Sequence, residues 1–173
     1  MTKQPEIIIT DSSVLVNFLA VDRTDLLAAH TNQFVITDHV ADEITYAYPE
    51  RYDRFMDSIR LGSITKISVN DPVEVELFMR LSSERRLGNG ECSAIAVASH
   101  RGCTLAIDDR KAIKRAHSLN HALAIVTTKD IIVDCIQQGI LDVQTADSIK
   151  NDWAQNHKFS LNISSFQDIL PRK

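Results

Sequence analysis

Five acidic residues stand where a metal ion could be held. They are Asp11, Glu43, Glu91, Asp108 and Asp109. Three of these acids directly follow short apolar runs, a fourth lies six residues beyond one, and Glu91 opens a segment rich in Ala, Ile and Val. Carboxylates gathered at strand ends repel one another, and a shared hard cation such as Mg²⁺ or Mn²⁺, which takes oxygen ligands, offsets that repulsion. The pattern therefore predicts a divalent metal site.

The elements that must position these acids follow an alternating pattern of apolar runs and helical segments. We predict strands near residues 6–10, 34–37, 64–69, 104–107 and 123–127. Helices are expected at 13–19 and in pieces toward 29, and at 40–46, 50–61, 72–85, 91–101, 110–119 and 129–138. This alternation is typical of βαβ units and indicates an α/β fold, with a short and mainly parallel sheet flanked by helices.

The end of the chain continues the pattern less clearly. We expect an edge strand at residues 140–143 and two short helices at 146–153 and 164–170. Thr127 or its neighbour Thr128 is expected to cap the helix predicted at residues 129–138.

In an open parallel sheet the carboxyl ends of the strands share one edge, and ligands bind there. Asp11 and the pair Asp108 and Asp109 should therefore converge, although about a hundred residues separate them. Side chains of neighbouring strand residues point to opposite faces, so only one of the two aspartates is expected to bind metal directly. The other could bind through water, cap the next helix or pair with Arg110.

The hydroxyl residues that flank the first acid have two readings. Thr10, Ser12 and Ser13 could orient the Asp11 carboxylate or a water bound to the metal. They could equally cap the first helix.

Size and composition bound the class of protein. The 173 residues, 44% of them hydrophobic, predict one domain spanning residues 1–173. A net charge of −4 gives no overall cationic field, so contact with nucleic acid would need a local basic patch or a metal bridge. The three cysteines form no C-x-x-C pair, which favours reduced thiols. We find neither a signal core nor an apolar run of roughly 20 residues, and we expect a cytoplasmic protein without a membrane span.

Four segments resemble the PIN-domain ribonucleases of the VapC type, the toxins of bacterial and archaeal toxin–antitoxin pairs. They are residues 8–15 (IITDSSVL), 40–44 (VADEI), 87–96 (LGNGECSAIA) and 105–112 (LAIDDRKA). The third segment is similar to the family signature G-E-a-x-A-I-A-l-A and is the most specific. Two departures are Cys92, where alanine is more usual, and Ser13, where many members carry asparagine. In the fourth segment, alignment of the arginine favours Asp109 as the acid, with Asp108 a close second.

This resemblance implies a PIN-like, Rossmann-like three-layer sandwich, dependence on Mg²⁺ or Mn²⁺, and hydrolysis of RNA. It also implies a homodimer and a small antitoxin protein as partner. We assign Asp11, Glu91 and Asp109 as the principal metal ligands, with Glu43 and Asp108 completing the site or accepting the proton of the nucleophile. One-metal and two-metal sites both stay open. Thr127, at the last strand end, is counted among the supporting polar residues.

Six basic residues are candidates for binding RNA phosphates. They are Arg85, Arg86, Arg110, Lys111, Lys114 and Arg115. The last four have helical spacing beside the predicted site, and the first two precede Glu91. An ordinary solvated helix face is the alternative reading.

Two other functions fit some of the same residues. A receiver-type phosphoacceptor domain also combines acids at strand ends with a later threonine and lysine, but its paired acids belong at the first strand. A PIN fold that serves only as a binding module is the other alternative. Metal-dependent RNA cleavage, labelling by acetyl phosphate, or neither would separate the three functions.

Overall fold

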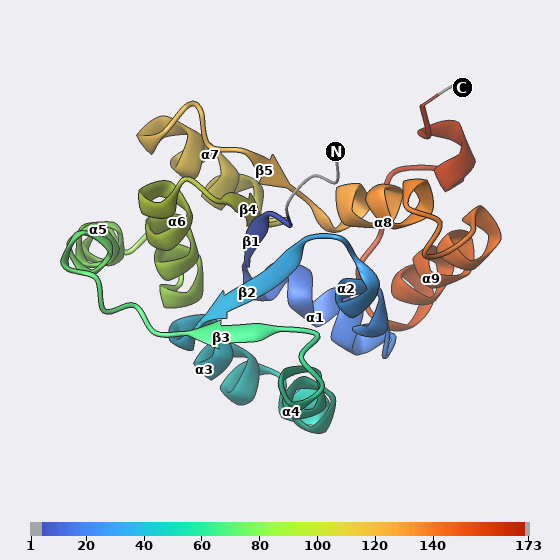
Figure 1. The fold of residues 1–173 in the computed structure, drawn as a ribbon, viewed down its shortest axis with the longest axis horizontal. Coiled ribbons are helices and arrows are strands. Elements are labelled where there is room, and N and C mark those ends of the chain that lie inside the picture. The colour runs from blue at the N-terminus through green and yellow to red at the C-terminus, as the bar shows by residue number, and fades with distance from the viewer. Residues whose placement is uncertain (1–4, 172–173) are drawn as a thin grey trace.

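The computed structural model describes residues 5–171 and shows a five-stranded, fully parallel sheet with strand order β3-β2-β1-β4-β5 (Figure 1). The strands are β1 Ile7–Thr10, β2 Gln33–Thr37, β3 Thr65–Ile67, β4 Thr104–Ala106 and β5 Ile125–Val126. All five predicted strands are present, although β3 and β5 are shorter than expected. The predicted α/β class is therefore confirmed.

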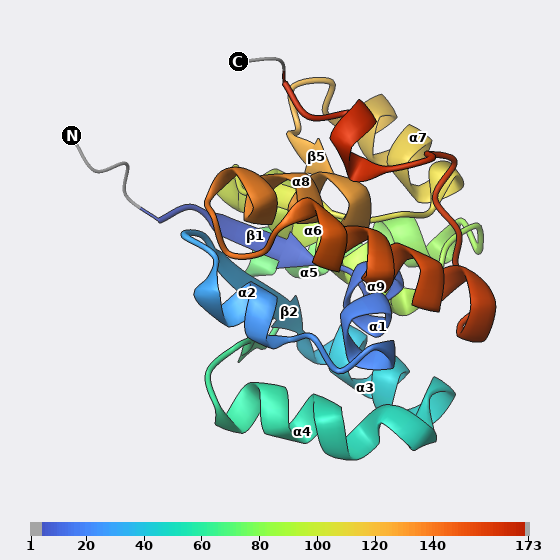
Figure 2. The same cartoon turned by 90° about the vertical axis from the view of Figure 1, so that its right-hand side faces the viewer.

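Helices cover both faces of this sheet. They are α1 Ser12–Ala20, α2 Asp25–Ala29, α3 Asp38–Ala47, α4 Tyr52–Arg60, α5 Pro72–Ser83, α6 Asn89–Arg101, α7 Arg110–Leu119, α8 Thr128–Gln137 and α9 Val143–Asn156, with 3₁₀ turns at Pro49–Arg51 and Phe166–Asp168. Figures 1 and 2 show α5, α6 and α7 on one side of the sheet and α1, α2, α8 and α9 on the other. None of the described helices is long and apolar enough to cross a bilayer.

The register of the strands brings the carboxyl ends of β1 and β4 level with each other. Thr10 pairs with Ala106, and the backbone N–H of Asp11 donates to the Ala106 carbonyl at 2.9 Å. The residues that follow β4 therefore start beside the residue that follows β1, as the sequence predicted.

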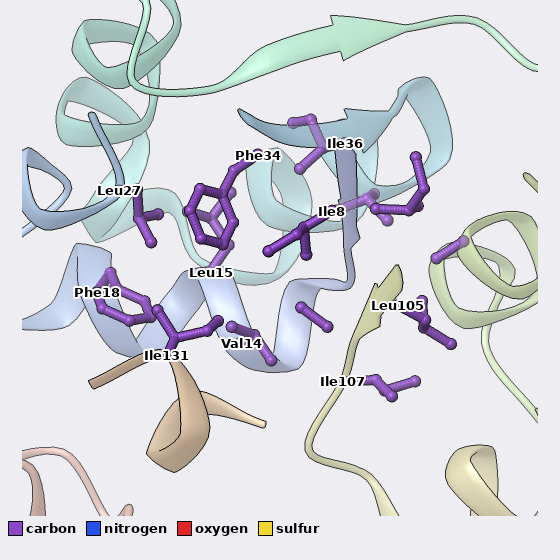
Figure 3. Close-up of a cluster of buried hydrophobic side chains, with 14 of the residues drawn as sticks. Ile8, Val14, Leu15, Phe18, Leu27, Phe34, Ile36, Leu105, Ile107 and Ile131 are labelled. Atoms are coloured by element: carbon purple, nitrogen blue, oxygen red, sulfur yellow. The ribbon is translucent and has the colours of Figure 1, made fainter. Parts of the chain in front are cut away.

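The helices that carry the acids are fixed by burial. Residues 14–20 of α1 and 92–98 of α6 are all buried, in a core that also contains strand residues such as Ile8, Phe34 and Leu105 (Figure 3). Burying a large aliphatic or aromatic side chain stabilises the fold by about 1.5–3 kcal/mol. Both helices are consequently held rigidly where they begin, next to Asp11 and Glu91.

The C-terminal part departs from the sequence-based prediction in two ways. The predicted edge strand at 140–143 is wrong, because Asp142 accepts a hydrogen bond from the Thr145 backbone N–H at 2.7 Å and begins α9 there. The short helix predicted at 146–153 is the middle of this longer helix, and the one predicted at 164–170 is only the 3₁₀ turn Phe166–Asp168. The apolar residues around Asp142 favoured a strand in the prediction, whereas in the structure Asp142 caps a helix.

The three cysteines are free thiols in the described structure, and Cys92 and Cys135 are buried in the core.

Candidate metal centre

Asp11 lies at the centre of the site, between the end of β1 and the start of α1. Its side chain is 1% exposed and caps α1, with Oδ2 accepting from the Ser13 backbone N–H at 2.9 Å. The other oxygen, Oδ1, is buried and has no hydrogen-bond partner among the described residues. The pKa of Asp11 is raised to about 6, mainly by burial and in part by the charge of Glu43, while the hydrogen bonds from Ser13 oppose the change. A buried carboxylate oxygen without a donor is costly, and a cation would remove that cost.

Glu43 reaches the site from α3. Its Oε2 accepts a hydrogen bond from the Ser12 hydroxyl at 3.0 Å. The carboxylate lies against the first turn of α6 so closely that a Cβ added at Gly90 would overlap Oε2. Gly90 has helical backbone angles that any residue could adopt, so its neighbour Glu43 is what requires a glycine there. The sequence predicted Glu43 but gave no reason for Gly90.

Glu91 stands in the first turn of α6, and its side chain bonds back to the N-cap residue of that helix. Its Oε2 accepts from the Gly88 backbone N–H at 2.9 Å. Burial raises the pKa of Glu91 to about 7, the bond from Gly88 opposes the change, and the negative charges of Asp11, Asp109 and Glu43 add to it. These four carboxylates therefore form one electrostatic group, which we call the acidic centre.

Asp109 joins the acidic centre from the N-terminus of α7. Its Oδ1 caps that helix by accepting from the backbone N–H groups of Lys111 at 2.8 Å and Ala112 at 2.9 Å. The negative charge of Asp109 contributes to the raised pKa of Glu91, which places Asp109 with the other three acids.

Asp108 faces a different set of partners. Its Oδ1 accepts from the Thr128 backbone N–H at 2.9 Å, and its Oδ2 accepts from the Thr128 hydroxyl at 2.6 Å and from the Asn17 amide at 3.0 Å. Burial raises the pKa of Asp108, and these bonds oppose the change. The Asp108 backbone N–H donates to the Ser13 hydroxyl at 3.1 Å. The adjacent aspartates thus point to different neighbours, although both lie beyond the end of β4 and strand alternation does not apply to them.

Sequence reasoning missed Asn17, and it named Thr128 only as a possible helix cap, not as a partner of Asp108. The Asn17 amide donates to Asp108, to the Thr128 hydroxyl at 3.1 Å and to the Ser13 carbonyl at 3.0 Å. A single asparagine in the apolar run 14–20 was the available signal, because a buried amide needs partners. The predicted Thr127 caps α8 and bonds Asp130 instead, with the two side chains 2.7 Å apart.

The flanking hydroxyls do not cap the first helix, because Asp11 itself caps α1. Ser12 orients Glu43 and Ser13 accepts from Asp108, while the buried Thr10 hydroxyl donates to the Ile8 carbonyl at 3.3 Å.

The donors of the acidic centre suit a hard cation in their chemistry. All four are carboxylates, and the unpartnered Oδ1 of Asp11 lies among them. Within residues 5–171, no three His, Cys, Asp or Glu side chains already stand in a ligating arrangement. Binding an ion would therefore draw these carboxylates closer together, with the backbone of the buried helices fixed.

Four of the six predicted basic residues line one pocket. The pocket has a volume of about 540 Å³ and is lined by Arg86, Leu87, Lys111, Lys114, Arg115 and Ser118. Arg115 is held by Glu84, with Nε 2.9 Å from Oε2. In the described part of the chain, Arg86, Lys111 and Lys114 make no ion pair. We call this the cationic pocket; Arg85 and Arg110 are exposed residues outside its lining.

Comparison with known proteins agrees with this fold. The sequence profile of a family described as "PIN domain" matches residues 7–171. No curated protein matches the chain.

Two solved structures share the fold at low sequence identity, and a third is similar at a lower TM-score. PAE2754 from Pyrobaculum aerophilum is 17% identical, with a TM-score of 0.54 over 79% of this chain and 95% of that chain. The PIN domain of RRP44 from T. brucei is 13% identical, with a TM-score of 0.54 over 84% and 88%. A chain of VapBC2 from Rickettsia felis, bound to a promoter DNA fragment, is 18% identical, with a TM-score of 0.48 over 70% and 98%.

The parallel sheet with four convergent carboxylates at its carboxyl edge defines a protein of PIN-domain architecture. With the profile matching nearly its whole length, the chain belongs to the PIN-domain family. The resemblance to the PIN-domain family seen in the sequence is confirmed. The receiver alternative is wrong, because receiver domains have the strand order 2-1-3-4-5, whereas this sheet has β3-β2-β1-β4-β5.

Proposed function

We propose that this protein is a metal-dependent endoribonuclease that hydrolyses RNA phosphodiester bonds at the acidic centre. The observation that carries the proposal is the buried, unpartnered Oδ1 of Asp11 in a group of carboxylates whose negative charges raise the pKa of Asp11 and of Glu91. Without a cation, the repulsion between these carboxylates and the unpartnered oxygen destabilise the folded state. Acids with pKa values perturbed in this way are concentrated at functional sites.

Asp11, Glu91 and Asp109 are the residues that would hold Mg²⁺ or Mn²⁺. When bound, such an ion offsets the charge of the phosphodiester and lowers the pKa of a water molecule, which makes hydroxide available for attack. Glu43 is held by Ser12 and Gly90 beside the same group, where it can complete the site or accept the proton of the attacking water.

Asp108 has a positioning role in this proposal. Both of its oxygens are occupied by Thr128 and Asn17, which tie the end of β4 to α8 and α1. Asp109, the next residue, is thereby held at the start of α7.

The cationic pocket supplies the charge that an RNA backbone needs. Arg86, Lys111 and Lys114 lie beside the acids without counter-ions among the described residues, and they could each bind a phosphate oxygen. A local basic surface of this kind compensates for the net charge of −4.

The biological setting belongs to the same proposal and is supported by the sequence motifs. We propose a cytoplasmic toxin, homodimeric, and held inactive by a small antitoxin protein that covers the acidic centre. Finding a gene for a small DNA-binding protein beside this one would support that setting.

Purified protein and a mixed pool of single-stranded and structured RNAs test the catalytic proposal. We expect cleavage with Mg²⁺ or Mn²⁺, none with EDTA, and none from the Asp11→Asn and Glu91→Gln variants. If the wild-type protein binds RNA but leaves it intact with either metal, the chain is a PIN-fold binding module and the nuclease proposal is wrong.

A further inference from the structure

A second pocket borders the acidic centre at Glu43. It has a volume of about 280 Å³ and is lined by His39, Asp42, Glu43, Tyr46, Asn89 and Gly90, from α3 and the first turn of α6. Figures 1 and 2 place α3 and α7 on opposite sides of α6, so this pocket and the cationic pocket flank the acids from different sides. We call it the α3 pocket.

The two pockets have opposite electrostatic character. The cationic pocket is lined by four basic side chains, whereas the α3 pocket has two carboxylates, Asp42 and Glu43, and no Lys or Arg in its lining. A phosphate group would be repelled from the α3 pocket. An RNA strand that crosses the acidic centre would therefore place backbone in the cationic pocket and an uncharged group in the α3 pocket.

The side chains of the α3 pocket suit a nucleobase. Tyr46 is 84% exposed, which leaves the ring of a large aromatic side chain open to solvent at the pocket rim. Unstacked RNA bases are commonly recognised by stacking on such rings and by hydrogen bonds to their Watson–Crick edges.

Polar groups for such hydrogen bonds are also available. Within the described part of the chain, the side chains of Asp42, Tyr46 and Asn89 make no hydrogen bond or ion pair to other residues. Since Asp42 is a carboxylate, it accepts hydrogen bonds only, and it favours a base edge that presents donors.

We propose that the α3 pocket binds the RNA base next to the scissile phosphate and that it prefers guanine. Guanine presents two adjacent donors, N1–H and N2–H₂, which match the two oxygens of Asp42. Its ring stacks on Tyr46, and the Asn89 amide lies in the same pocket as a further hydrogen-bonding group. This inference rests on the proposed function, because the pocket shares Glu43 with the acidic centre.

Cleavage of a randomised RNA pool, mapped by sequencing, tests the inference. We expect wild-type cuts to show a guanine preference at one position adjacent to the cut. Tyr46→Ala should reduce cleavage of the preferred sites by roughly tenfold or more, while Tyr46→Phe, which keeps the stacking ring, should retain it. Asp42→Asn should lose the preference for guanine and still cleave. Tyr52→Ala is the matched control, because Tyr52 is also exposed, at 41%, but lies on α4 outside the pocket.

Unchanged base preference in both Tyr46→Ala and Asp42→Asn would overturn the inference and leave the nuclease proposal intact.

RNA binding measured in EDTA, where no cleavage is expected, tests the pocket independently of catalysis. Fluorescence anisotropy of labelled tetranucleotides with and without guanine should show tighter binding of the guanine-containing one, and this difference should disappear in Tyr46→Ala. If wild type does not cleave RNA but shows this difference, the pocket assignment stands and the catalytic proposal fails. Equal binding of both tetranucleotides by wild type would overturn the pocket assignment.

Discussion

The acidic centre and Asp108 both lie at the carboxyl edge of the sheet, and they differ in how completely the hydrogen bonds of their carboxylates are satisfied. Both oxygens of Asp108 have donors, from Thr128 and Asn17. In the acidic centre, Oδ1 of Asp11 has none among the described residues, and Glu91 is surrounded by like charges. Burial raises the pKa of Asp11, of Glu91 and of Asp108. A raised pKa alone therefore does not identify a binding site, whereas missing partners point to a ligand.

We expect the largest effect on cleavage from a substitution of Asp109. Asp109→Asn should lower metal-dependent cleavage by at least about 100-fold, because altering even the groups that support a metal ligand commonly costs 10- to 100-fold. Its thermal stability should change little, since an asparagine can still cap α7. Initial rates on one labelled RNA, with melting curves as the folding control, measure both. Parental activity in Asp109→Asn would show that Asp109 is not a ligand.

Asp108→Ala should have the opposite profile. Removing this carboxylate leaves the backbone N–H and the hydroxyl of the buried Thr128 without their acceptors. The expected loss of folding free energy is about 2–4 kcal/mol, since each buried donor left unpaired costs about 1–3 kcal/mol. Urea unfolding measures the change. Full stability combined with lost metal binding would move Asp108 into the acidic centre and remove the distinction between the two groups.

The pH dependence of stability offers a third test. The raised pKa of Asp11, about 6 against an ordinary 3.8, means that the unfolded state releases the Asp11 proton at lower pH than the folded state. The contribution of Asp11 is therefore most favourable below pH 4 and is lost as pH rises through 6. Without metal, Asp11→Asn should gain stability relative to wild type between these pH values, on the order of 1–3 kcal/mol. A difference in melting temperature that does not vary with pH would contradict this.

Gly90 provides a smaller and more local test. In Gly90→Ala the new methyl group overlaps Oε2 of Glu43, and the carboxylate must swing away. Because the displaced atom is the end of a flexible side chain, we expect little loss of stability but roughly a tenfold loss of cleavage, within the range for disturbed supporting groups. Gly88→Ala is the control, since its Cβ would lie 3.4 Å from Glu43 Oε1, an ordinary contact. Equal activity of the two variants would show that the position of Glu43 is unimportant.

The sequence was informative about the acidic edge because strand ends and acids are local features. The apolar runs before Asp11 and Asp108 predicted β1 and β4, and parallel pairing then required their ends to meet. What it could not show was which aspartate faces which partner, since that depends on Asn17 and Thr128, 91 and 20 residues away from Asp108. The requirement for glycine at position 90 likewise arises only when α3 and α6 pack together. The C-terminal helix α9 was mispredicted because its cap, Asp142, competes with the apolar residues just before it.

Thermal unfolding of the wild-type protein and of the Asp11→Asn/Glu91→Gln double variant, with increasing Mg²⁺ or Mn²⁺ at constant ionic strength and pH 8, tests the central claim most directly. If the acidic centre binds the ion, the wild-type protein gains about 2.7 kcal/mol at a concentration 100 times Kd, and the double variant gains nothing. An identical response of the two proteins, or no response in the wild type, would contradict the assignment of these carboxylates to a metal centre.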